Sequence, residues 1–75
     1  MELDLHGLSV EEATSRISMS LWSFEQDDYE TELRVITGRG TGAMQTTFLN
    51  ILDEHDNLQC VEVNSGSYLV TKTNY

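Results

Sequence analysis

The sequence contains no proline and a single cysteine, Cys60, in 75 residues. A lone cysteine cannot close an internal disulfide, which excludes a disulfide-stabilised secreted scaffold and favours the reducing cytoplasm. No apolar run approaches the ~20 residues needed to span a bilayer, and the first residues lack the basic and apolar regions of a secretion signal. We therefore expect a cytoplasmic protein with no membrane partner.

Basic side chains are also scarce. Only four lysines and arginines accompany thirteen acidic residues, and the formal net charge is −9. Such a surface repels phosphate backbones at long range and offers little counterion release on binding nucleic acid. Any DNA or RNA partner must therefore be held by a local site, or by other domains of a longer parent chain.

The chain has the length of one small domain, and without repeats or linker-like segments residues 1–75 are predicted to form it alone. Hydrophobic periodicity, a Ser9/Glu12 capping box and turn residues predict six elements. These are a strand over residues 3–6, a helix after Ser9, a strand over 32–37, a helix opened by Thr41 or Gly42, and a hairpin of strands 59–63 and 67–72.

Each predicted helix has one apolar stripe. The two stripes are Val10, Ala13, Ile17, Leu21 and Phe24, and then Met44, Phe48, Ile51 and Leu52. Right-handed crossover makes the first two strands parallel, and both helices then cover the same side of the sheet. The predicted fold is α/β, a two-layer βαβαββ sandwich with a mixed sheet whose opposite face is open.

Four residues outside this pattern also have expected environments. Met19 and Trp22 are predicted to extend the core, with a partner surface as the alternative. Cys60 is predicted to pack against a strand face. His55, at the acidic end of the second helix, is predicted to be solvated or to interact with the helix dipole.

Two polar clusters fall at the carboxyl ends of the predicted parallel strands, where ligands bind in open α/β sheets. Asp4 and His6 are two residues apart, so on a strand they share a face. An imidazole moves protons near neutral pH, and a carboxylate can orient it or hold a cation. The 38–42 turn has three glycines that let backbone N–H groups converge, and Arg39 has a fork suited to phosphate.

Each cluster also has a structural alternative. A tight strand–helix turn needs glycine whatever its function, and the spacing here is neither the dinucleotide nor the P-loop spacing. An Asp-x-His pair is often a solvated or locally hydrogen-bonded rim. The interpretation as a site depends on the two clusters lying together.

Both clusters match a family. Residues 3–8 followed by Val10-Glu11-Glu12-Ala13 resemble the opening signature of the small MutS-related (Smr) domain. Residues 38–44 resemble its second motif, usually His-Gly-Lys-Gly-Thr-Gly followed by a small and an apolar residue. The resemblance implies a fold similar to the C-terminal domain of bacterial translation initiation factor three. It also implies nucleic-acid binding and, in several members, endonuclease (nicking) activity.

The resemblance also implies site residues and a setting. Asp4 and His6 match the residues proposed for catalysis, and the phosphate- or nucleic-acid-binding positions are Gly7, Gly38, Arg39, Gly40, Thr41 and Gly42. In bacteria the domain commonly ends a MutS-related protein of recombination control or stalled-ribosome rescue. Two positions depart from the pattern: Thr37 replaces the second motif's histidine, and Gln45 replaces a frequent arginine.

The sequence is therefore compatible with three functions. The first is an endonuclease domain that hydrolyses phosphodiester bonds of DNA or RNA, with participation of magnesium or manganese left open because Asp4 is the one obvious nearby hard ligand. The second is a non-catalytic Smr-fold module that binds nucleic acid or protein. The third is a protein-interaction domain that uses the open sheet face.

Overall fold

The computed structural model describes residues 1–38 and 42–73, and the elements follow one another as predicted. They are β1 (Glu2–Asp4), α1 (Val10–Gln26), β2 (Glu32–Ile36), α2 (Ala43–Leu52), β3 (Leu58–Asn64) and β4 (Ser67–Lys72). The main difference is at β1, which ends two residues before the predicted boundary because the chain turns at His6 and Gly7. In the described part of the chain, no helix is long and apolar enough to cross a membrane.

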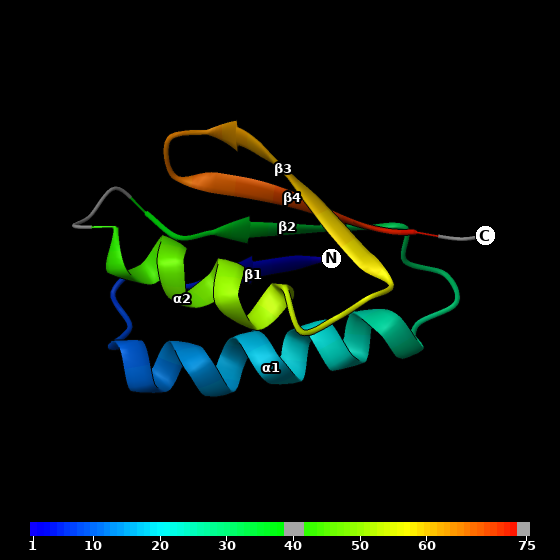
Figure 1. The fold of residues 1–75 in the computed structure, drawn as a ribbon, viewed down its shortest axis with the longest axis horizontal. Coiled ribbons are helices and arrows are strands. Elements are labelled where there is room, and N and C mark those ends of the chain that lie inside the picture. Colours follow the sequence, from blue (N-terminus) through cyan, green and yellow to red (C-terminus); the bar gives the residue numbers. More distant parts are fainter. Residues whose placement is uncertain (39–41, 74–75) are drawn as a thin grey trace.

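The four strands form one mixed sheet in the order β1-β2-β4-β3. Strands β1 and β2 are parallel, and β2–β4 and β4–β3 are antiparallel. Both helices lie on the same side of the sheet and leave its other face uncovered (Figure 1). The predicted two-layer α/β sandwich is confirmed.

The core lies between the sheet and the two helices. Leu33 and Val35 point from β2 toward the helices and are fully buried, as strand alternation requires. The helices contribute their buried residues Ala13, Ile17, Leu21, Phe24, Phe48 and Leu52. The Phe48 and Tyr68 rings pack across the layers with centroids 5.3 Å apart.

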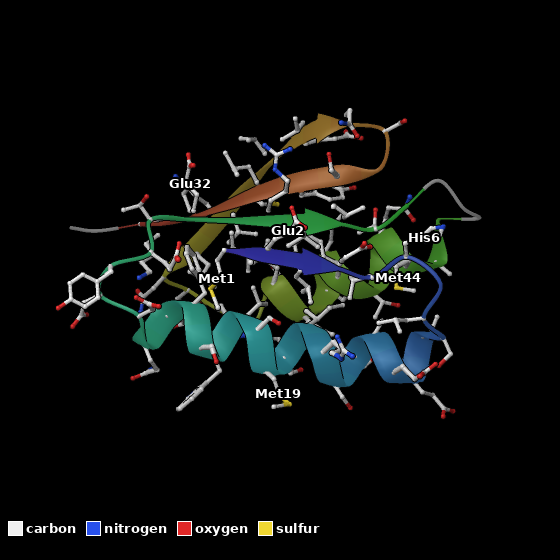
Figure 2. All side chains as sticks on the ribbon, turned by 180° about the vertical axis from the view of Figure 1, so that it is seen from behind. Met1, Glu2, His6, Met19, Glu32 and Met44 are labelled. Carbon is white, nitrogen blue, oxygen red and sulfur yellow. The ribbon has the colours of Figure 1, made fainter. Side chains whose placement is uncertain are left out.

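Three residues predicted to lie in the core do not. Met19 and Trp22 remain 71% and 62% exposed, and Met19 lies on the side of α1 that faces away from the sheet (Figure 2). At 3.6 residues per turn Met19 is rotated about 200° from buried Ile17. Val10 is 44% exposed because it is the first helical residue, and it lies at the edge of the layer.

The environment of His55 also differs from the prediction. Its side chain is largely buried, and Nδ1 contacts a carboxylate oxygen of Glu25 in the last turn of α1. This pair connects the α2–β3 loop to α1. Cys60 packs against the core as predicted, and burial raises the pKa of its thiol.

The capping box sets where α1 begins. The Ser9 Oγ accepts from the Glu12 N–H, and the Glu12 carboxylate accepts from the Ser9 N–H at 3.1 Å. The hydrogen bonds with Ser9 lower the pKa of Glu12 from its ordinary value of 4.5. Since this carboxyl is more acidic in the folded chain, its stabilising contribution is complete above the unfolded pKa and is lost as pH falls through the folded pKa.

We therefore expect Glu12→Gln to destabilise the domain near pH 7 and to differ little from the unmodified chain near pH 2 to 3. Urea denaturation at the two pH values measures this difference. The matched control is Glu11→Gln, in the same helical turn but outside the capping box, and its effect should be smaller. An equal loss in the Glu12 variant at both pH values would contradict the prediction.

Candidate nucleic-acid interface

The turn between β1 and α1 presents His6 to solvent. The chain leaves the sheet after Leu5, whose N–H still donates to the Ile36 carbonyl at 2.8 Å. The His6 N–H then donates to Asp4 Oδ1 at 2.9 Å, and Gly7 turns the chain with a φ of +83°. The prediction that Asp4 and His6 share a strand face is therefore wrong, because His6 lies in the turn. The Asp4 carboxylate holds the main chain of His6.

The turn between β2 and α2 begins at Thr37 and Gly38. Gly38 has a φ of +80°, and Gly42, the N-cap of α2, has a φ of +92°. Residues with a side chain rarely adopt such φ values, so both positions favour glycine. The predicted binding residues Arg39, Gly40 and Thr41 lie outside the described residues.

The β3–β4 hairpin turn holds the turn between β2 and α2 in place through hydrogen bonds. The Gly66 carbonyl accepts from the N–H groups of Thr37 and Gly38, at 2.8 and 3.2 Å. The Thr37 hydroxyl is buried and donates to the same carbonyl at 3.3 Å. A Cβ on Gly66 would lie only 3.3 Å from the carbonyl carbon of Gly38. No sequence signal connected Gly66 to the site, because a hairpin turn explains the Asn-Ser-Gly segment alone.

Gln45 supports the turn from the side of α2. Its Nε2 donates to the Gly38 carbonyl at 3.0 Å. Its Oε1 is buried and has no hydrogen-bond partner among the described residues. Thr37 and Gln45, the two departures from the family pattern, therefore both hold the main chain at Gly38.

The two motifs come together at one end of the molecule. A Cβ built on Gly38 would lie 3.6 Å from Cδ2 of His6, so the imidazole lies directly beside the glycine turn. Both turns line an open cleft of about 440 Å³, together with residues at the starts of α1 and α2. Figure 2 shows His6 and Met44 of α2 at this end of the sheet. Within the described residues, His6 of the first cluster and Gly38 of the second therefore lie together.

The start of α2 gives this cleft a positive electrostatic contribution. Gly42 supplies no side-chain cap, and the first turn of α2 contains no acidic residue. The first backbone N–H groups of a helix carry the positive end of its dipole, which favours an anion. Among residues 1–38 and 42–73, no group of three or more potential metal-ligand side chains occurs.

The fold and the site define a class: a two-layer α/β domain that places a histidine turn beside a glycine turn at the carboxyl ends of two parallel strands. The family model of the Smr domain matches residues 3–68. The chain belongs to the Smr domain family, whose members in general bind nucleic acids. A search of curated proteins found no significant match.

Solved Smr domains share the fold. The Smr domain of Thermus thermophilus MutS2 is 25% identical, with a TM-score of 0.82 over 95% of each chain. The human small-MutS related domain is 29% identical, with a TM-score of 0.68 over 93% of this chain and 98% of its own. The Smr domain of NEDD4-binding protein 2 is 27% identical, with a TM-score of 0.69 over 99% of this chain and 86% of its own.

Proposed function

We propose that this Smr domain is an endonuclease that nicks DNA or RNA at the cleft between the two turns. The observation that carries the proposal is the position of the exposed His6 imidazole directly beside Gly38. One group that can move a proton then lies next to a turn and a helix N-terminus that favour a phosphate.

In this mechanism the scissile phosphate binds against the glycine turn and the start of α2, with Arg39 as the cationic partner. His6 accepts a proton from the attacking water while the water oxygen bonds to phosphorus. The bond from phosphorus to the leaving oxygen breaks, and His6 returns the proton to that oxygen. Asp4 is a positioning residue, because its carboxylate fixes the main chain of His6. No group of three or more potential metal-ligand side chains occurs among the described residues, and no step is assigned to a cation.

A non-catalytic nucleic-acid-binding module is the second candidate. One observation favours it: Thr37, which replaces the histidine of the second motif, is buried and hydrogen-bonded to Gly66. A threonine hydroxyl does not titrate near neutral pH, so a mechanism that needs two histidines is not open to this chain.

The test is incubation of the domain with supercoiled plasmid and with structured RNA, at low salt, with and without magnesium or manganese. Nicked circles or RNA fragments are expected, and the metal arms show whether a cation participates. Arg39→Ala should weaken binding about fivefold, as expected for loss of one charged phosphate contact. The control Arg34→Ala removes an exposed arginine of β2 and should bind as the unmodified domain does.

Binding without cleavage would favour the second candidate. Failure to bind either nucleic acid at low salt, where electrostatic attraction is least screened, would overturn both.

A further inference from the structure

The cleft has apolar walls that a phosphate does not need. Leu8 lines it from the turn before α1, Val10 from the first position of α1, and Met44 from α2. Val10 is 44% exposed in a chain whose other helix-stripe residues are buried or half-buried. Leu8 and Met44 also pack against the core, whereas Val10 is exposed. Phosphates are bound by N–H groups and cations, so an exposed apolar side chain beside the turns suits a different part of the ligand.

Charge leads to the same conclusion. The net charge is −9, and of the four lysines and arginines in the chain only Arg39 belongs to the two turns. Contacts to successive backbone phosphates therefore cannot supply most of the affinity. Stacking and apolar contacts do not depend on charge, because every nucleobase has an uncharged π-face.

We propose, building on the proposed function, that the cleft binds an unpaired nucleobase. The base stacks against the His6 imidazole and packs on Val10 and Met44, while its phosphate lies beside Gly38 and the start of α2. A cleft of about 440 Å³ lies within the range of ~300–1,000 Å³ typical of small-molecule pockets, and so suits one nucleotide. A base inside a continuous duplex is stacked on both faces and enters such a cleft only after it is unpaired and extruded, which costs free energy that an unpaired base does not pay. The substrate class is therefore a single-stranded or unpaired segment.

Three labelled oligonucleotides of the same length separate base binding from backbone binding: an unstructured single strand, its blunt duplex, and a single strand with abasic sites. The single strand and the abasic strand carry the same phosphates. Fluorescence anisotropy with the intact domain should show at least about tenfold tighter binding of the single strand than of either other probe.

Variants assign the effect to the cleft. Val10→Ala removes two methyl groups at an exposed first helical position, where alanine favours the helix. It should weaken single-strand binding about fivefold and leave abasic-strand binding unchanged. The matched control is Val61→Ala, the same truncation at a 62% exposed position on β3, which should change neither. Met44→Leu keeps the side chain large and apolar and should retain most of the binding.

The outcomes distinguish the two proposals. Equal binding or nicking of all three probes would overturn the base-binding cleft and leave the proposed nuclease standing. Tight binding of the single strand that Val10→Ala does not weaken would place the base elsewhere and would also overturn the inference. Binding of none of the probes would overturn both proposals.

Discussion

Replacement of His6 by glutamine is expected to reduce cleavage at least about 100-fold, the lower end of what general acid–base catalysis by one side chain contributes. Glutamine has a similar reach and can hydrogen-bond, but it cannot accept and return a proton near neutral pH. The side chain of His6 is exposed, and its structural hydrogen bond to Asp4 is made by the main chain. The substitution should therefore leave the fold and nucleic-acid binding largely intact. Initial rates of plasmid nicking and RNA cleavage measure the loss.

The matched control is His55→Gln. His55 is the only other histidine, and it pairs with Glu25 between α1 and the α2–β3 loop. This variant should keep the cleavage rate of the unmodified domain, although it should lower the melting temperature. Undiminished cleavage by His6→Gln would remove His6 from the mechanism and would indicate a contaminating nuclease or another catalytic group.

Phe48→Ala is expected to produce the largest loss of stability, about 3–5 kcal/mol. The Phe48 ring is fully buried where α2 meets the sheet, and it packs on Tyr68. Truncation removes the transfer free energy of the ring, leaves a cavity and loses the aromatic pair. At about 0.05–0.15 kcal/mol per residue, a domain of this length has only about 4–11 kcal/mol in total.

Thermal and urea denaturation should show a melting temperature lower by at least about 15 °C. Leu49→Ala is the control, because the neighbouring Leu49 of α2 is 39% exposed and its truncation should cost much less. Equal effects of the two substitutions would show that α2 contributes little to the core.

Much of the fold followed from local patterns. The buried positions Leu33 and Val35 alternate along a strand, and the Ser9/Glu12 box fixes the start of α1. Such patterns involve residues only a few positions apart, so they can be recognised in a single sequence. The prediction for Met19 and Trp22 was wrong because their exposure follows from their position off the buried stripe of α1 and not from their hydrophobicity. The pairing of His55 with Glu25 joins residues thirty positions apart and has no local signal.

The position of the site was predictable from the sequence. The hydrogen bonds that hold its two turns in place were not. Parallel strands place His6 and Gly38 at one edge, so their proximity followed from topology. The role of Asp4 was not predictable, since it depends on where β1 ends. The positions of Thr37 and Gln45 in the sequence marked them as departures from the family. Only their bonds around Gly38 show what they do.

The contact between Gly66 and Gly38 makes the β3–β4 turn a poor place to insert residues. Hairpin turns are ordinarily among the places where a protein best accepts inserted residues. Here a methyl group on Gly66 would lie 3.3 Å from the Gly38 carbonyl carbon, a tight contact, and the Gly66 carbonyl accepts from the N–H groups of both Thr37 and Gly38. Fusion partners and reporter peptides are therefore better attached elsewhere, for example in the loop of residues 27–31 between α1 and β2, at the far end of the domain from the turn between β1 and α1 (Figure 1).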